Sequence, residues 1–119
     1  MSGGDWKEMF NAGCDGDLPL VQYHVRAGVD VNYAHPEFLS TPLVGAILAG
    51  QEAVALYLLE NGAIASLPSE FDGATPMQAA RRAGLTAVED RLHALGIPRP
   101  PVPPQPTSWL QRLLARSAA

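Results

Sequence analysis

A stretch in the middle of the chain, TPLVGAILAG at positions 41–50, places its apolar residues three and four positions apart. This spacing is typical of one face of a helix. Thr41 is suited to the N-cap of that helix, and Pro42 to its first position, where no partner for a backbone N–H is needed. The stretch VALYLL at positions 54–59 predicts a second helix with a broad apolar face. Because neither helix is long enough to be stable alone, both are expected to pack on neighbours.

The same organisation recurs further along the chain. The stretch TPMQAARRAG at positions 75–84 repeats the Thr-Pro start and the final glycine of the stretch at 41–50. Two series of glycines repeat at an interval of 34 residues: Gly16, Gly50 and Gly84, and Gly28, Gly62 and Gly96. Repetition of this length indicates stacked supersecondary units that share one continuous core.

These units resemble the ankyrin repeat, whose signature is Thr-Pro-Leu-His-x-Ala-Ala-x-x-Gly, then a Val/Ile and Leu-Leu helix, Gly-Ala and an Asn-bearing finger loop. The middle unit matches at Thr41, Pro42, Leu43, Ala46, Gly50, Val54, Leu58, Leu59, Gly62 and Ala63. The last unit matches at Gly73, Thr75, Pro76, Ala80, Gly84, Val88, Leu92 and Gly96. The first unit keeps Ala12, Gly16, Leu18, Gly28, Asp30, Val31 and Asn32. The resemblance implies an all-α solenoid of three helix-turn-helix units with short finger loops, at about residues 5–36, 37–70 and 71–97.

The sequence departs from the ankyrin pattern in three ways. The signature His is replaced by Val44 in the middle unit and by Gln78 in the last, so its usual hydrogen bond between repeats is absent or replaced. The interval of 34 residues exceeds the usual 33, which places one extra residue in each finger loop. In the first unit, Asp5 and Glu8 have the spacing of an Asp-x-x-Glu capping box.

The end of the chain has a different character. The proline-rich stretch at residues 98–106 predicts an extended linker, because proline disfavours helix and sheet. TSWLQRLLARSAA at residues 107–119 predicts a C-terminal amphipathic helix. Its apolar stripe consists of Trp109, Leu110, Leu113 and Leu114. We expect this stripe to pack back on the repeats, against Glu89, Asp90 or an exposed Leu56; docking on another protein and attachment to a membrane surface are the alternatives.

Charge is unevenly distributed along the chain. Residues 1–97 hold all twelve Asp and Glu and five Lys and Arg, a net charge of −7, whereas residues 98–119 hold three Arg and no acid, a net charge of +3. An acidic body argues against nucleic-acid binding and favours a partner with a basic surface. The hydrophobic content of 47% indicates a folded domain. We expect a monomeric cytoplasmic protein without a membrane span or secretory signal, from a bacterium.

The sequence offers little for catalysis or for metal and cofactor binding. His24, His35 and His93 are not spaced as metal ligands. His24 takes the place of Leu58 in the middle unit and is expected to be buried, whereas His35 is expected to be a solvated loop residue and His93 a surface residue. Cys14 is flanked by Asp15 and Asp17, which would raise its pKa and disfavour a reactive thiolate. We therefore expect no catalytic residues, no metal site and no cofactor.

The resemblance also indicates which residues contact a partner. In ankyrin proteins these are the finger tips and the exposed side of the inner helices. The corresponding positions are Glu37, Phe38, Ser40, Leu48, Ala49, Phe71, Asp72, Ala74, Arg82 and Ala83, with Cys14 and Asp15 in the first unit. For Phe38 and Phe71 two interpretations remain open: contact with a partner, or packing inward made possible by the extra finger residue.

The sequence thus predicts a non-catalytic protein-protein interaction module that binds a partner protein through its concave face and finger loops. One alternative is a small immunity-type protein that inhibits a toxin or an enzyme by covering a basic active site. Another is an adaptor that uses its C-terminal helix for attachment.

Overall fold

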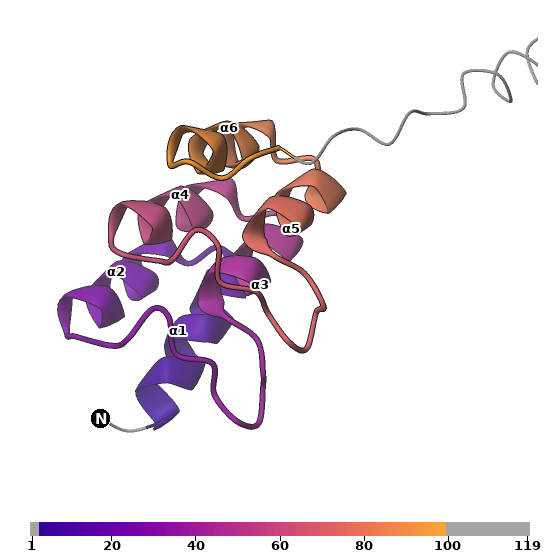
Figure 1. The fold of residues 1–119 in the computed structure, drawn as a ribbon. Helices are drawn as coiled ribbons and strands as arrows, with labels where there is room; N and C mark the ends of the chain where they lie inside the picture. The colour runs from indigo at the N-terminus through magenta and orange to yellow at the C-terminus, as the bar shows by residue number, and fades with distance from the viewer. Residues whose placement is uncertain (1–2, 100–119) are drawn as a thin grey trace, which may run out of the picture.

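The computed structural model describes residues 3–99, which form six α-helices (Figure 1). In chain order these are α1 (Gly3–Asp15), α2 (Leu18–Arg26), α3 (Pro42–Leu48), α4 (Glu52–Glu60), α5 (Pro76–Ala83) and α6 (Thr86–Ala94). Within the described range, the only β-type pairing is an isolated bridge between Ser69 and Ala74. The prediction of an all-α fold is confirmed. The predicted C-terminal helix and most of the predicted linker lie outside the described residues.

The helices form consecutive hairpins that stack in two rows. Helix α1 packs against α2, α3 against α4, and α5 against α6. In one row α3 lies between α1 and α5, and in the other α4 lies between α2 and α6 (Figure 1). Each hairpin therefore covers the apolar faces of the next, and this mutual burial stabilises helices that are too short to persist alone.

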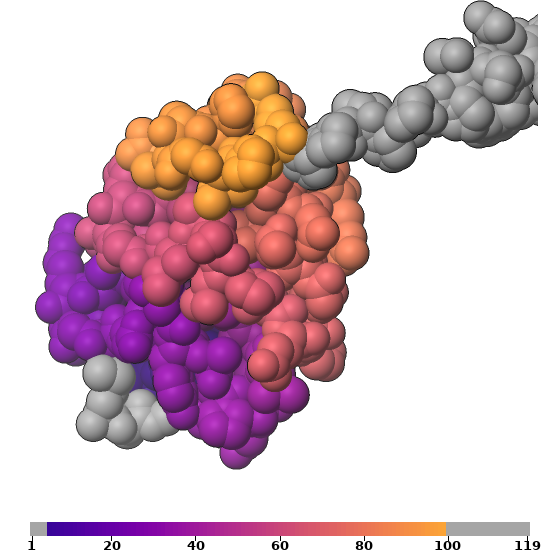
Figure 2. Space-filling view, in the orientation of Figure 1, coloured from indigo at the N-terminus to yellow at the C-terminus, as the bar shows by residue number. Residues whose placement is uncertain are grey.

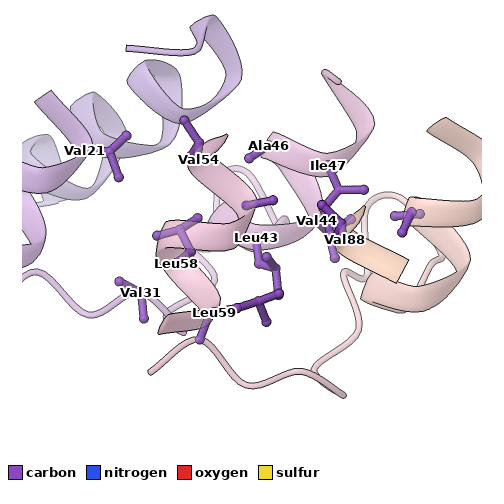
Figure 3. Close-up of a cluster of buried hydrophobic side chains, with 14 of the residues drawn as sticks. Val21, Val31, Leu43, Val44, Ala46, Ile47, Val54, Leu58, Leu59 and Val88 are labelled. Atoms are coloured by element: carbon purple, nitrogen blue, oxygen red, sulfur yellow. The ribbon is translucent and has the colours of Figure 1, made fainter. Parts of the chain in front are cut away.

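The hydrophobic core runs continuously through the stack (Figure 3). Val21, Ile47, Leu58 and Val88 contribute to it from α2, α3, α4 and α6, and each is at most 1% exposed. His24 is only 4% exposed, and its Nε2 lies 3.0 Å from Oε1 of Glu8 on α1. The predicted burial of His24 is thus confirmed, and the hydrogen-bonding contact with Glu8 explains how a polar ring is accommodated at a core position.

The residues that begin the helices were predicted from the sequence correctly at α3 and incorrectly at α1. Thr41 caps α3 by accepting a hydrogen bond from the backbone N–H of Val44, as predicted. The capping box predicted at Asp5 and Glu8 is wrong, because α1 already begins at Gly3. The structure instead has a capping box at the start of α5, where Thr75 and Gln78 exchange hydrogen bonds. Gln78, which replaces the signature His, therefore acts within its own helix.

The finger loops repeat their backbone geometry as well as their sequence. Leu39 has a φ of 54° and Gly73, 34 residues later, has a φ of 59°. This left-handed conformation suits glycine and is strained for leucine. The two fingers are joined where the backbone N–H of Phe71 donates to the carbonyl of Leu39 at 3.0 Å. They therefore form one continuous edge of the molecule, beside the inner helices α1, α3 and α5 (Figure 1).

A single side chain links the first finger to the second hairpin. The Asn32 amide donates to the carbonyl of Gly62 at 2.9 Å and accepts from the N–H of Ile64 at 2.7 Å. The positions one repeat later are Ser66 and Pro98, and a proline has no N–H to donate. The link between hairpins that Asn32 provides is thus specific to the first junction of the described stack.

Candidate protein-binding site

A hollow of about 370 Å³ opens between the inner helices α1 and α3 and the two finger loops. Its lining residues are Phe10, Cys14, Glu37, Phe38, Ser40, Gly45, Leu48, Phe71 and Asp72. Figure 2 shows the two fingers, purple and salmon, meeting on the surface of the molecule. Most of the lining is apolar, and its two ionisable acids, Glu37 and Asp72, come from the two fingers. We name this feature the finger hollow.

An aromatic cluster at the base of the first finger supports one wall of the finger hollow. Phe10 stacks on Trp6 with ring centroids 5.1 Å apart, and Phe38 meets both rings edge-on at 5.1 and 5.3 Å. His35 also stacks on Trp6, at 5.6 Å, and is half-buried. The prediction that His35 is a solvated loop residue is therefore wrong, because the finger folds back over Trp6, which is 1% exposed.

The two finger phenylalanines have opposite environments. Phe38 is half-buried in the aromatic cluster, whereas Phe71 is 74% exposed. Of the two interpretations left open, inward packing therefore applies to Phe38. Phe71 instead presents most of its ring to solvent. A highly exposed aromatic side chain at the edge of an apolar hollow is the type of residue that anchors protein interfaces.

Gly45 allows α1 and α3 to approach closely beneath the finger hollow. A Cβ at this position would lie 2.8 Å from a ring carbon of Phe10 and 3.4 Å from Sγ of Cys14. A larger residue at position 45 would displace Phe10 or move the two helices apart. Gly45 thus permits the close spacing of α1 and α3 at the hollow.

The acids at the edge of the finger hollow are held in place by neighbouring side chains. Glu37 accepts a hydrogen bond from Nζ of Lys7 at 2.8 Å, and this bond together with the lysine charge lowers the pKa of Glu37. Asp72 accepts from the hydroxyls of Ser40 at 2.9 Å and Ser69 at 2.6 Å. Lys7 offsets the charge of Glu37, whereas the two donors to Asp72 are uncharged, so Asp72 supplies most of the acidic character of the rim.

Cys14 lies in the finger hollow with its thiol in a protonated state at neutral pH. Burial raises the pKa of the Cys14 thiol, and the nearby charges of Asp15 and Asp72 raise it further. The sequence indicated Asp15 and Asp17 as the neighbouring acids, but Asp17 caps α2 and Asp72 takes its place. Such a thiol is a poor nucleophile.

Six of the ten predicted contact residues line the finger hollow: Glu37, Phe38, Ser40, Leu48, Phe71 and Asp72. Ser40 is only 4% exposed and its hydroxyl is bonded to Asp72, so its prediction as a contact residue is corrected. Ala49 and Arg82 are exposed but lie outside its lining, and Ala83 is half-buried. Ala74 is 2% exposed, so its prediction as a contact residue is corrected: its side chain packs inside the molecule. The predicted tail contacts Trp109, Leu110, Leu113 and Leu114 lie outside the described residues.

Sequence reasoning missed Phe10 and Gly45 as lining residues. Phe10 lies one helical turn before Cys14, which had been assigned to the exposed side of the first inner helix. Positions four apart share a helix face, so this spacing was a signal that could have identified Phe10. Gly45 had no such signal, because its importance depends on the ring that packs over it.

The described residues contain no arrangement that suggests metal chemistry or a membrane span. Within residues 3–99, no three His, Cys, Asp or Glu side chains are grouped so that they could hold a metal ion. No helix in the same range is long and apolar enough to cross a membrane.

His93 is exposed, as predicted, and its Nδ1 lies 3.2 Å from the carbonyl of Ile97.

Stacked helix hairpins joined by finger loops define a helical-repeat protein. Among solved structures, an ankyrin repeat domain from Acinetobacter baumannii AYE is similar, with 31% identity, a TM-score of 0.67, and coverage of 74% of this chain and 46% of that one. The human ASB11 ankyrin repeat domain is similar too, with 32% identity, a TM-score of 0.65, and coverage of 74% and 39%. The chain belongs to the ankyrin repeat family.

The match spans less than half of the length of either of these two domains. No protein-family model matches the sequence, and no curated protein matches it. The family assignment therefore depends on the fold and on the repeat pattern.

Proposed function

We propose that this chain is a non-catalytic module that binds a partner protein through the finger hollow and the surrounding concave face. Ankyrin repeat domains are generally protein-protein interaction modules. The observation that carries the proposal is the finger hollow itself, which combines an apolar lining with the 74% exposed ring of Phe71. An exposed aromatic beside a concave apolar surface supplies both an anchor and a pocket for a partner.

We propose further that the module consists of three ankyrin units at about residues 5–36, 37–70 and 71–97, followed by a linker at 98–106 and an amphipathic segment at 107–119. The support is the pairing of α1 with α2, α3 with α4 and α5 with α6, one pair in each unit.

The charge of the site favours a partner with a basic surface. Glu37 and Asp72 are the charged residues of the hollow lining, and residues 1–97 carry a net charge of −7. Opposite charge accelerates association and disfavours acidic competitors. An immunity-type inhibitor of a toxin or enzyme with a basic active site would use the same surface.

The test compares which proteins are captured by three forms of the full chain from extracts of the source cells. These forms are the wild type, a double variant Leu48→Glu/Phe71→Ala, and a control variant Tyr23→Ala. Tyr23 is a suitable control because it is 63% exposed and lies on the outer helix α2. The proposal expects a protein that is retained by the wild type and by Tyr23→Ala but lost with the double variant. If every captured protein is retained by all three forms, the finger hollow is not the binding site.

A further inference from the structure

The terminal hairpin does not offer the contacts first expected for the C-terminal segment. Arg99 already forms ion pairs with Glu89, at 3.8 Å, and with Asp90. Leu56, expected to be exposed, is half-buried against the core. The acidic and apolar groups predicted to receive the segment are thus engaged by nearer residues.

The finger hollow provides both kinds of group in one place. Its lining combines Phe10, Phe38, Leu48 and Phe71 with the carboxylate of Asp72, whose hydrogen-bond donors are the hydroxyls of Ser40 and Ser69. The other carboxylate of the lining, Glu37, already pairs with Lys7. Its volume of about 370 Å³ falls within the range of about 300–1,000 Å³ found for ligand pockets. A suitable occupant therefore has bulky apolar side chains next to cationic ones.

Residues 107–119 have this chemistry. Trp109 and Leu113 are four positions apart, as are Leu110 and Leu114, and Arg112 and Arg116 accompany them without any acid. We propose that this segment occupies the finger hollow of its own chain, with Trp109 and Leu113 on the apolar lining and the arginines facing Asp72. This inference rests on the proposed function, because the segment would then compete with a partner for the same site.

The connecting residues are long enough for this placement. Residues 100–106 include five prolines, and an extended chain of seven such residues spans roughly 22 Å at about 3.1 Å per residue. Packed helices lie about 8–10 Å apart. The hollow is lined by α3, which neighbours α5 in the inner row, and by α1, which is the next helix beyond α3. The segment can therefore reach the hollow from Arg99 by passing along the stack.

Cys14 provides a direct probe of occupancy, because it is the only cysteine in the chain and lines the hollow. The experiment measures the rate at which a maleimide reagent labels Cys14 in the full chain. The wild type is compared with a double variant Trp109→Ala/Leu113→Ala and with a control Gln111→Ala. A segment that occupies the hollow for nine-tenths of the time lowers the labelling rate about tenfold.

The proposal expects the double variant to be labelled several-fold faster than the wild type, and Gln111→Ala to be labelled at the wild-type rate. Far-ultraviolet circular dichroism and the unfolding transition of each form establish that the repeats remain folded. Equal labelling rates in all three forms would overturn the proposal. Protection that disappears on dilution would also overturn it, because the occupant would then be a second copy of the chain.

The outcomes also separate this inference from the proposed function. If labelling is equal in all forms while a partner is lost with Leu48→Glu/Phe71→Ala, only the placement of the segment is wrong. If the double variant is labelled faster but no partner depends on Leu48 and Phe71, the segment does occupy the hollow and the proposed function fails.

Discussion

The guanidinium of Arg81 lies 4.0 Å from the carboxylate of Glu89, at positions where the preceding hairpin has two buried apolar residues. One repeat earlier the equivalent residues are Ile47 and Ala55, both 0% exposed. Ile47 and Ala55 are covered because another hairpin follows them. Arg81 and Glu89 instead give the last hairpin of the described stack a polar outer surface. Such a surface can face water where apolar side chains would need a further repeat to cover them.

Replacing this pair by its apolar equivalents should make the chain self-associate. In the double variant Arg81→Ile/Glu89→Ala, the last hairpin would present the kind of surface that the middle hairpin buries. We expect a folded protein whose apparent mass rises with concentration, measured by size-exclusion chromatography with light scattering. The matched control is Arg82→Ile/Glu52→Ala, which removes the same charges at exposed positions whose side chains do not take the place of Ile47 and Ala55. A double variant that stays monomeric at every concentration would show that the ion pair is not what ends the stack.

The link made by Asn32 should be important for stability. Asn32→Ala removes the hydrogen bonds to the Gly62 carbonyl and the Ile64 N–H, which join two hairpins. We expect the free energy of unfolding to fall by about 1–3 kcal/mol. Urea unfolding followed by circular dichroism measures the change.

Asn61→Ala is the comparison for Asn32→Ala. Its amide also donates to a backbone carbonyl, that of Tyr57 at 2.8 Å, but this carbonyl belongs to the adjacent helix turn. We expect a smaller loss of stability for Asn61→Ala. Equal losses in both variants would argue against a special role for the link between hairpins.

The strained backbone of Leu39 predicts a stabilising substitution. Leu39 has a φ of 54°, and its equivalent in the next finger is Gly73. Leu39→Gly should raise the free energy of unfolding by about 1 kcal/mol, because a left-handed conformation costs an L-residue about 1–2 kcal/mol. The reciprocal variant Gly73→Leu should lower it by a similar amount. A decrease in stability for Leu39→Gly would mean that packing of the leucine outweighs the strain.

The reactivity of Cys14 should depend on pH in a way that reveals its neighbours. Because the pKa of Cys14 is raised in the folded chain, folding favours the protonated thiol. The contribution of Cys14 to the free energy of unfolding should therefore be fully present below the pKa of the thiol in the unfolded chain, and it should be lost as the pH rises through the pKa of the thiol in the folded chain. The pH profile of maleimide labelling should have its midpoint above the value of about 8.5 expected for a free cysteine.

Removing the charge of Asp72 should shift the Cys14 profile. Asp72→Asn takes away one of the charges that raise the pKa of the thiol, so the labelling midpoint should move to lower pH. Asp17→Asn serves as the control, because Asp17 caps α2 and is not among the causes of the shift. Identical profiles for Asp72→Asn and the wild type would show that the charge of Asp72 does not contribute to the raised pKa of Cys14.

Features that depend on neighbouring residues along the chain could be predicted from the amino-acid sequence. The 34-residue repeat predicted where helices and turns occur, and Gly50 and Gly62 adopt the positive φ values of 79° and 98° expected of helix-ending glycines. Thr41 caps its helix as predicted, because a cap needs only residues three positions apart. The family resemblance also named, as partner contacts, seven of the nine residues that line the finger hollow.

Which of two similar side chains is buried became clear only from the packing of the hairpins against one another. Phe38 packs on Trp6 and Phe10 while Phe71 stays 74% exposed, although both are finger residues of the same type. His35 and Ala74 were misjudged for the same reason: burial depends on what lies opposite in space. Local sequence restricts the backbone, whereas the environment of a side chain is set by residues from other hairpins, whose positions the repeat pattern does not specify.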